Sequence, residues 1–402
     1  MNQNPMNITL DEKPSTTPSL LRSLQTFFTN PQARAVGLVF TTESLSLGGW
    51  VAHIPYVKEK LHLTDAGLGM VLFAMPVGLL LMNPLTGWII ARLGAARTCF
   101  LSALVLCFST LIPINAPNVA LMAFGLFLVG LSAALLNVAM NTCAADVERE
   151  QKILIMSSCH GMWSLGGMVG SLLAGILIAI HVSPSIHMLA VTIALLLLTV
   201  ALRPILATIP AQPPTESSAA FVKPNMLLLL MIFIGLAVAM GEGAALDWSA
   251  VYLHESTGAS SQIAALGFGC FSLAMTIGRF MGDAIIPRFG AKRILSVGSL
   301  VAASGLLLAI LVPVPLVVLA GFTLLGAGCS LIAPILYTAS MRVPGIPAAT
   351  GLATFATFSF IGFLAGPPVI GFVAEAYGLA YGLGLVVVVL VLSAFISRKV
   401  NV

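Results

Sequence analysis

Long apolar stretches recur along the whole of this 402-residue chain. A helix needs about 20 mostly apolar residues to cross the hydrocarbon core of a bilayer. Twelve stretches of this kind lie between polar, Gly or Pro breaks, at roughly residues 34–57, 66–91, 97–115, 118–145, 153–181, 184–206, 226–253, 262–287, 293–312, 315–341, 348–374 and 378–397. The pattern predicts an all-α membrane protein with twelve transmembrane helices.

The composition excludes the soluble alternatives. Hydrophobic residues make up 58% of the chain and charged residues 8%, against about a quarter charged in a typical globular protein. Fourteen acids and 18 bases are too few to solvate a surface of this size, which excludes a soluble enzyme, a nucleic-acid-binding protein and a disordered chain. The six cysteines fall in apolar stretches without a CxxC pair or clustered histidines, which indicates buried free thiols. We therefore expect no metal and no cofactor.

The positions of lysine and arginine predict the orientation, because cytoplasmic loops carry an excess of both. With the N-terminus in the cytoplasm, 15 of the 18 basic residues lie on the cytoplasmic side, Lys58 and Lys60 lie outside, and Arg279 lies within a span. The first 32 residues are polar and lack the basic start and apolar core of a signal peptide. Both termini are therefore expected in the cytoplasm.

The chain divides into two similar halves. Residues 207–225, rich in Pro, Ser and Ala, are typical of a flexible linker. The segment 89–97, Ile-Ile-x-Arg-x-Gly-Ala-x-Arg, recurs at 285–293, an offset of 196 that also relates Gly130 to Gly326. Six spans in each half give a parallel repeat about an axis along the membrane normal. The predicted organisation is a cytoplasmic tail (1–33), a six-helix bundle (34–206), a cytoplasmic linker (207–225), a second six-helix bundle (226–397) and a short cytoplasmic tail (398–402).

The two halves, the central linker and the basic loop after the second span resemble the major facilitator superfamily (MFS) of secondary transporters. Its loop signature, Gly-x-x-x-Asp-Arg-x-Gly-x-Arg-Arg, is matched by Gly87, Arg92, Gly94 and Arg97, and in the second half by Arg288, Gly290, Lys292 and Arg293. The resemblance implies that these residues form a cytoplasmic gate. The signature acid is replaced by Ala91 in the first half and Pro287 in the second. We therefore expect the first-half loop to bind helix C-terminal carbonyls or the acids between Asp146 and Glu150.

Within the superfamily the chain looks most like the fucose-permease-like branch of bacterial inner-membrane proteins. The resemblance rests on three runs: 137–141 (Asn-Val-Ala-Met-Asn), 160–167 (His-Gly-Met-Trp-Ser-Leu-Gly-Gly) and 242–250 (Glu-Gly-Ala-Ala-Leu-Asp-Trp-Ser-Ala). Relatives usually have an acid at the position of Asn137. The proton-coupling role that this acid has in the relatives therefore cannot be assigned directly to Asn137. The resemblance implies a multi-pass inner-membrane transporter that alternates between two states by rocking of its halves.

Four ionisable residues inside predicted spans are candidates for proton coupling, because a charge there costs about 2.5–3.5 kcal/mol and usually has a function or a partner. Glu43 and Glu242 lie closest to mid-membrane, and each is on a span that the resemblance places at the cavity wall. We predict that these two acids form the proton-coupling set. Asp247, nearer the outer surface, and His160 are the next candidates, although an outer-gate bond or a simple core hydrogen bond explains them equally well. Five residues separate Glu242 from Asp247, about 140° around a helix, so we do not expect both on one narrow face.

The candidate lining of the substrate cavity consists of amide and aromatic side chains on the predicted cavity spans. Asn137 and Asn141 are four residues apart and share one helix face. Two roles are open for the amides, which either bind a hydroxylated solute or hydrogen-bond two helices together. Two roles are also open for the tryptophans, which either stack on a ring of the solute or anchor the span at the membrane interface. The full set of candidates is Asn137, Asn141, Trp50, Trp163, Trp248 and Tyr337. Arg279 and Asp283 are also four apart, and we expect an ion pair that braces the cytoplasmic gate beside Arg288.

These residues favour a secondary active transporter. The chain contains no Gly-x-x-x-x-Gly-Lys loop, so ATP is not the expected energy source. The expected solute is small and neutral or weakly charged, and the branch resemblance favours a sugar-like molecule. The other expected partners are protons and the lipid bilayer. We expect a monomer, and nothing indicates a nucleic-acid partner. Proton symport is favoured, while sodium coupling and an antiporter that exports drugs or metabolites stay open. An intramembrane enzyme is disfavoured because His254-Glu255 lacks a second histidine and Ser164 lacks a nucleophile elbow. A transporter-derived sensor is disfavoured because the inner segments are too short for a signalling domain.

Overall fold

The computed structural model describes residues 20–210, 223–346 and 348–400. Within these ranges every regular element is an α-helix, which confirms the predicted all-α fold class. In the described residues, eleven helical segments are long and apolar enough to cross a membrane, and the bent pair α2–α3 makes twelve. The parts 1–19 and 211–222 of the predicted tail and linker lie outside the described residues.

The first half consists of six spans, three of them broken into two helices. They are α2 (Pro31–Val51) with α3 (Ile54–Lys60), α4 (Asp65–Leu72) with α5 (Ala74–Leu93), α6 (Ala95–Ser109) with α7 (Leu111–Asn115), α8 (Val119–Gln151), α9 (Met156–Ala179) and α10 (Pro184–Leu206). The first span bends by 45° between α2 and α3.

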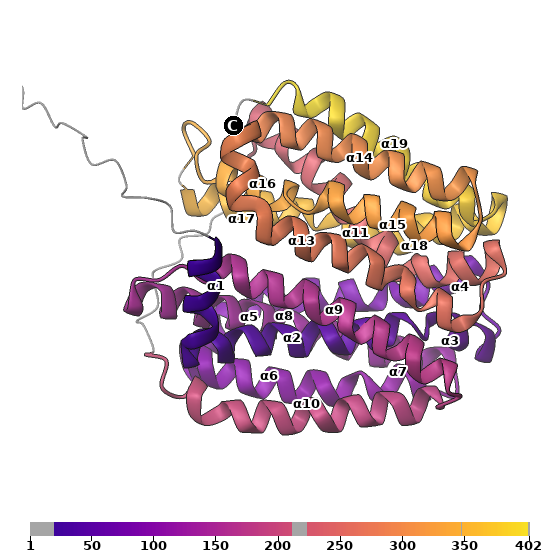
Figure 1. Cartoon of the computed structure of the whole chain (residues 1–402), viewed down its shortest axis with the longest axis horizontal. Helices are drawn as coiled ribbons and strands as arrows, with labels where there is room; N and C mark the ends of the chain where they lie inside the picture. The colour runs from indigo at the N-terminus through magenta and orange to yellow at the C-terminus, as the bar shows by residue number, and fades with distance from the viewer. Residues whose placement is uncertain (1–19, 211–222, 347, 401–402) are drawn as a thin grey trace, which may run out of the picture.

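Within its described residues, the second half also has six spans, and three of them are broken, although these are its second, fourth and fifth spans. Its helices are α11 (Met226–Thr257), α12 (Ser261–Ala264) with α13 (Leu266–Phe289), α14 (Ala291–Leu311), α15 (Pro315–Cys329) with α16 (Ile332–Ser340), α17 (Ala348–Ser359) with α18 (Ile361–Tyr377), and α19 (Leu379–Ser397). Figure 1 shows the two halves as bundles lying side by side, with α9 facing α13 across the boundary between them.

Equivalent glycines pack in equivalent places in the two halves. A Cβ on Gly130 of α8 would overlap the carbonyl oxygen of Met75, and a Cβ on Gly326 of α15 would overlap that of Phe271. Met75 and Phe271 are themselves 196 residues apart, the same offset as the two glycines. The internal repeat of the sequence is therefore also a repeat of close helix contacts, which small residues permit in membrane proteins.

A helix precedes the first span, in a segment whose average polarity predicts only a tail. This helix, α1 (Leu20–Thr29), contacts α2 of the first half and α13 of the second. Phe27 is buried, and its ring fills the space that a side chain on Gly37 would need. Leu24, Phe27 and Phe28 recur at the three-to-four-residue spacing of one helix face. That spacing, rather than the average polarity of the segment, determines its structure.

The molecule has two ends that differ in charge. The end with α1 and the last described residues is called the terminal end below, and the opposite end, which includes α3 and the start of α4, is called the Lys58 end. The terminal end has the exposed basic side chains of Arg92, Arg97, Arg288 and Arg293. Many large apolar side chains are exposed along the flanks between the two ends, as expected for surfaces that meet lipid.

Candidate substrate cavity and the contacts between the halves

A cavity of about 250 Å³ lies between the two halves. Helices of both halves form its wall, among them α2, α8 and α9 from the first and α11, α13 and α18 from the second. The polar and aromatic side chains that line it are Phe40, Glu43, Trp50, Asn137, His160, Trp163, Glu242, Asp247, Arg279, Phe360 and Phe363. The four predicted proton-coupling residues thus all reach one space, as do three of the six cavity candidates.

Glu43 is the acid of the first half that lines this cavity. Its side chain lies on α2 and is 5% exposed, and Trp163 of α9 approaches its carboxyl group. The second carboxyl oxygen, Oε2, is buried without a hydrogen-bond partner among the described residues. A buried polar atom without a hydrogen-bond partner costs about 1–3 kcal/mol, so this oxygen is energetically unfavourable in the cavity.

Glu242 and Asp247 both line the cavity from α11. Their angular separation of about 140° predicts that they do not share one narrow face of the helix. In the structure both side chains nevertheless line the cavity. Leu246, which lies between them in the sequence, also lines the cavity, so the lining face of α11 extends from Glu242 through Leu246 to Asp247. Residues about 140° apart can therefore both reach it.

Arg279 lies in the cavity wall rather than in the basic cluster at the terminal end. Its Nη1 donates a hydrogen bond of 2.7 Å to Ser164 Oγ on α9 of the other half. Its Nη2 lies 4.0 Å from Glu242 Oε1, and its guanidinium lies 5.9 Å from the ring centre of Trp163. Arg279 therefore joins the two halves and partly neutralises Glu242.

The spacing of residues on α13 predicts a further partner for Arg279, and this pair stays a prediction. That spacing favours Asp283, whose side chain lies outside the described part of the structure. A four-residue spacing identifies possible neighbours on one helix, but it does not specify which face of that helix meets a cavity. A guanidinium within the membrane needs anionic or polar partners, and Glu242 and Ser164 supply them here.

The other cavity candidates divide into residues that line the cavity and residues that do not. Asn137 is exposed in the cavity wall, and Asn141 donates a 2.8 Å hydrogen bond to its carbonyl oxygen. His160 lines the cavity with its ring edge-on to Phe40, the ring centres 5.3 Å apart. Trp50 and Trp163 also line it, whereas Asn141, Trp248 and Tyr337 are not among its lining residues.

Trp248 and Tyr337 have different surroundings. Trp248 is fully buried in the apolar core, and its Nε1 has no hydrogen-bond partner in the described part of the chain. Tyr337 on α16 is 45% exposed and lies edge-on to Phe355 of α17. Trp50, at the position in the first half similar to that of Trp248, lines the cavity instead. The tryptophans at similar positions in the two halves therefore do not have similar environments.

The predicted gate residues lie at the terminal end. The guanidinium of Arg92 lies 4.3 Å from the ring centre of Trp88, and that of Arg288 lies 5.5 Å from that of Phe289. Gly94 and Gly290 end α5 and α13. A Cβ added to Gly87 would meet nothing within 4 Å.

Two of the three acids expected to receive the first-half loop have other partners. Asp146 pairs with Arg149 at 3.4 Å, and Glu148 Oε1 accepts hydrogen bonds from the backbone N–H groups of Ile155 and Met156 at 2.6 and 2.8 Å. Among the described residues, no ion pair joins Arg92 to this segment.

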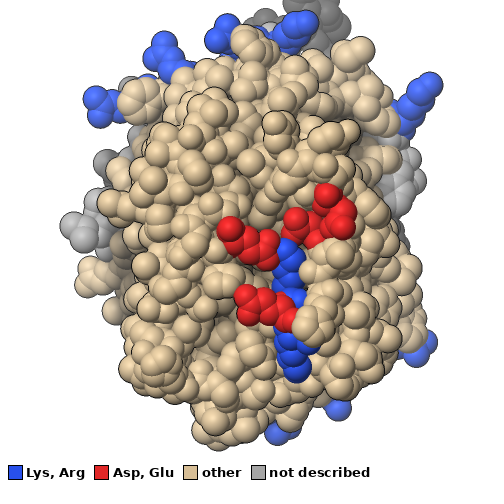
Figure 2. All heavy atoms as spheres, turned by 90° about the vertical axis from the view of Figure 1, so that its right-hand side faces the viewer, with Lys and Arg blue, Asp and Glu red and all other residues tan. Residues whose placement is uncertain are grey.

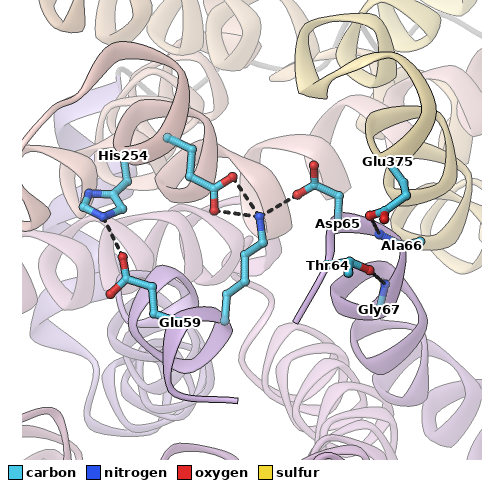
Figure 3. A network of polar contacts seen from close by, with 9 residues as sticks. Glu59, Thr64, Asp65, Ala66, Gly67, His254 and Glu375 are labelled. Atoms are coloured by element: carbon cyan, nitrogen blue, oxygen red, sulfur yellow. Dashed lines mark hydrogen bonds and ion pairs between the residues drawn. The ribbon is translucent and has the colours of Figure 1, made fainter. Parts of the chain in front are cut away.

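A polar network at the Lys58 end has no counterpart among the sequence predictions. Lys58 Nζ lies 2.6 Å from Asp65 Oδ1 of its own half and 2.6 and 2.7 Å from the two carboxyl oxygens of Glu255 in the other half. Glu59 accepts a 3.0 Å hydrogen bond from His254 Nε2, again between halves. Figure 3 shows these side chains converging from α3, α4 and α11.

A further contact of this network comes from α18. The backbone N–H of Ala66, in the first turn of α4, donates to Glu375 Oε2 at 3.4 Å. Figure 2 shows the acidic side chains of this face gathered around basic ones near its centre, with uncharged surface around them. The network, named the Lys58 network below, therefore lies where the two halves meet.

Close backbone packing surrounds the Lys58 network. A Cβ on Gly69 of α4 would lie 2.5 Å from the carbonyl oxygen of Pro367, and one on Gly371 would lie 2.6 Å from that of Asp65. Ser171 of α9 donates a hydrogen bond to the carbonyl oxygen of Ala265. The two halves are therefore in contact at the Lys58 end, which closes the cavity from that side.

Two related six-helix halves that enclose a cavity within a membrane, with ionisable side chains from both, are the architecture of secondary transporters. The sequence model of the Major Facilitator Superfamily matches residues 36–345 and 227–400 of this chain. The chain is also 33% identical over 366 residues to an uncharacterised MFS-type transporter of Yersinia pestis, covering 90% of this chain and 94% of that one. The chain therefore belongs to the Major Facilitator Superfamily and is a multi-pass membrane transporter.

Solved structures agree on the fold. The nucleoside transporter NupG aligns with a TM-score of 0.65 and 14% identity over 92% of this chain and 98% of that one. The fucose:proton symporter FucP of E. coli aligns with a TM-score of 0.59 and 17% identity over 92% and 98% of the two chains. At these identities the likeness shows the fold alone.

Proposed function

We propose that this protein is a proton-coupled symporter that takes up a small polar solute by alternating access. The observation that supports it best is the cavity between the halves, which contains carboxylates from both of them and is closed at one end. Transporters of this architecture bind solute near the bilayer midplane and rock their halves around it. Rocking here requires that the Lys58 network open while the terminal end closes.

We further propose that the terminal end faces the cytoplasm and that the protein resides in a bacterial inner membrane. The arginines at the terminal end, against Lys58 and Lys60 at the other, support this orientation through the positive-inside rule. Both termini and the linker 207–225 then lie in the cytoplasm.

Glu43 and Glu242 are proposed as the coupling set. Glu43 fits the role of proton carrier because its Oε2 has no partner in the described part of the protein, and a proton there removes the cost of a buried charge. Glu242 is near Arg279, which also bonds Ser164 of the other half, so a change in its charge acts on a contact between halves. Asp247 and His160 are the next candidates.

The proposed solute is neutral or weakly charged, with hydroxyl groups and a ring as in sugars. Asn137 supplies an amide to the cavity, and Trp50 and Trp163 supply flat apolar faces. Sodium in place of protons, and export of drugs or metabolites by antiport, are the alternatives. Both give results different from symport in the assay below.

The test is solute-dependent proton movement in proteoliposomes with an internal pH dye. Sugars, sugar alcohols, amino sugars and nucleosides are added from outside without an imposed gradient. Symport acidifies the lumen, antiport makes it alkaline, and sodium coupling gives solute uptake that depends on sodium without a pH change. A panel in which no solute moves protons and none is accumulated in a sodium gradient contradicts the proposal.

The residue test compares Glu43→Gln with Lys223→Gln, a change of an exposed charged side chain outside the cavity and the gate. An amide keeps the volume of the side chain and mimics its protonated form. We expect Glu43→Gln to keep solute exchange but to lose accumulation driven by a pH gradient, and Lys223→Gln to keep both. Normal accumulation in both Glu43→Gln and Glu242→Gln contradicts the proposed coupling set.

A further inference from the structure

The cavity holds more negative than positive side chains. Glu43, Glu242 and Asp247 line it, and Arg279 is the one lysine or arginine among its lining residues in the described part of the chain. Arg279 lies beside Glu242, which leaves Glu43 and Asp247 without a cationic partner among the described residues. These two carboxylates come from different halves, one from α2 and one from α11.

One transported proton cannot neutralise the carboxylates of both Glu43 and Asp247. If Glu43 carries the transported proton, as proposed above, Asp247 still has no counter-ion. No hydrogen bond or ion pair within the described ranges reaches its carboxyl group. An isolated carboxylate inside a membrane protein is costly, so the loaded state is expected to supply a positive charge.

A second observation points to a ligand in the same space. Glu43 is nineteen-twentieths buried, lines the cavity, and leaves Oε2 without any hydrogen-bond donor among the described residues. A buried acceptor of this kind is normally satisfied in the functional complex. The cavity is thus short of both positive charge and hydrogen-bond donors, and an ammonium group supplies both, with three N–H donors and no acceptor.

The wall of the cavity favours an organic cation over a metal ion. Trp50, Trp163, Phe40, Phe360 and Phe363 line it together with the acids. Aromatic faces attract ammonium groups through their ring quadrupole, most strongly for tryptophan and when water is excluded. In the described residues, no three His, Cys, Asp or Glu side chains come close enough together to hold a metal ion.

We propose that the transported solute carries one protonated amine and that Asp247 is the counter-ion of that amine in the cavity. The inference rests on the proposed transport function and narrows its substrate class to small organic monoamines. In the loaded state Asp247 holds the ammonium group while Glu43 holds the proton, so both carboxylates without partners are neutralised together. The aromatic side chains enclose the carbon skeleton, and about 250 Å³ of space limits the solute to a small molecule.

The test uses matched probes that differ at one functional group. One set is glucosamine, glucose and N-acetylglucosamine, and the other is phenethylamine, 2-phenylethanol and N-acetylphenethylamine. Binding to the full chain in detergent is measured by calorimetry and by the rise in melting temperature. We expect at least one amine to bind, and to bind tighter than both of its uncharged partners.

The variants are Asp247→Asn, Asp247→Glu and Glu43→Gln. Removal of one partner from a buried charge pair generally costs enough to weaken binding about 30-fold or more, so Asp247→Asn should lose the preference for the amine by that factor. Asp247→Glu should restore most of it, and Glu43→Gln should keep it while losing proton coupling. The melting temperature of each variant without probe shows whether it is folded, and the rescue by glutamate separates charge from packing.

Each other outcome contradicts the inference. Equal binding within each matched set, or tighter binding of the uncharged members, excludes an amine as the recognised group while leaving the transport function intact. No binding by any amine probe, or stabilisation by sodium alone that Asp247→Asn abolishes, also overturns it. An unchanged preference in a folded Asp247→Asn protein shows that Asp247 is not the counter-ion. Failure of the transport function itself appears separately, as the absence of solute-dependent ion movement in proteoliposomes.

Discussion

At the scale of single residues, Gly94 and Gly290 show what a repeated sequence motif specifies. Each ends a helix with a positive backbone φ, +80° at Gly94 and +78° at Gly290, together with ψ of 150° and 145°. This region is almost exclusively accessible to glycine, because a Cβ would collide with the backbone. Gly94 and Gly290 are therefore needed for the sharp turn between spans, whatever their part in gating.

The first prediction at this scale compares two glycines of the same signature. Gly94→Ala should destabilise the protein by about 1–3 kcal/mol because of the strained backbone. Gly87→Ala, in the interior of α5 with nothing within 4 Å of a new Cβ, should be neutral or slightly stabilising. Thermal unfolding of both variants in detergent measures the difference in melting temperature. Equal melting temperatures would contradict this explanation of the motif.

The candidate site could be predicted from the sequence only in part, for a reason visible at Arg279. Depth along a span can be counted, so Glu43, Glu242, Asp247 and His160 could be assigned to the level of a cavity, and all four line it. The direction of a side chain around the helix depends on how the spans pack, which one sequence does not give. Counting therefore assigns Arg279 to the gate, although it bonds Ser164 across the cavity.

At the scale of helices, the Lys58 network explains how the halves are held together at one end. Lys58 of α3 is shared between Asp65 of α4 and Glu255 of α11, so a single ammonium group neutralises carboxylates of both halves. Its side chain is 10% exposed, so the pair is shielded from solvent more than a typical surface ion pair. No pattern in the sequence joins Lys58 to a residue 197 positions away, so its position predicts only the orientation of the chain.

The prediction at this scale is that Lys58→Gln opens the Lys58 end. Removal of the ammonium leaves Asp65 and Glu255 facing each other as like charges, which favours separation of the halves. Spin labels at Tyr56 of α3 and Ser256 of α11, in a background without the native cysteines, should show longer distances. The matched control is Lys60→Gln, because Lys60 donates to the carbonyl oxygen of Ile114 within its own half. An unchanged distance distribution in Lys58→Gln, or an equal change in Lys60→Gln, would count against the proposed role.

At the scale of the whole molecule, most of the fold was accessible from the sequence. Twelve apolar stretches and an offset of 196 residues are properties of composition and spacing, and the bilayer restricts such a chain to helices. The breaks within spans were not predicted. The bend of 45° between α2 and α3 separates helices that a hydropathy pattern joins, because an apolar residue is equally compatible with a straight and a bent span. Helix α1 was likewise hidden by the polar residues around it.

The last prediction concerns the orientation of the whole molecule. Fifteen of the 18 basic residues belong to the predicted cytoplasmic side, so the reverse orientation would require most of the positive charge of the protein to cross the membrane. We test it with single cysteines in place of Lys223, exposed next to the start of α11 at the terminal end, and of Tyr56, exposed at the Lys58 end. The native cysteines are replaced in both variants. A membrane-impermeant maleimide should label Tyr56→Cys in intact spheroplasts and should label Lys223→Cys only after lysis. Labelling of Lys223→Cys in intact spheroplasts would reverse the assignment, and with it the side from which the Lys58 network closes the cavity.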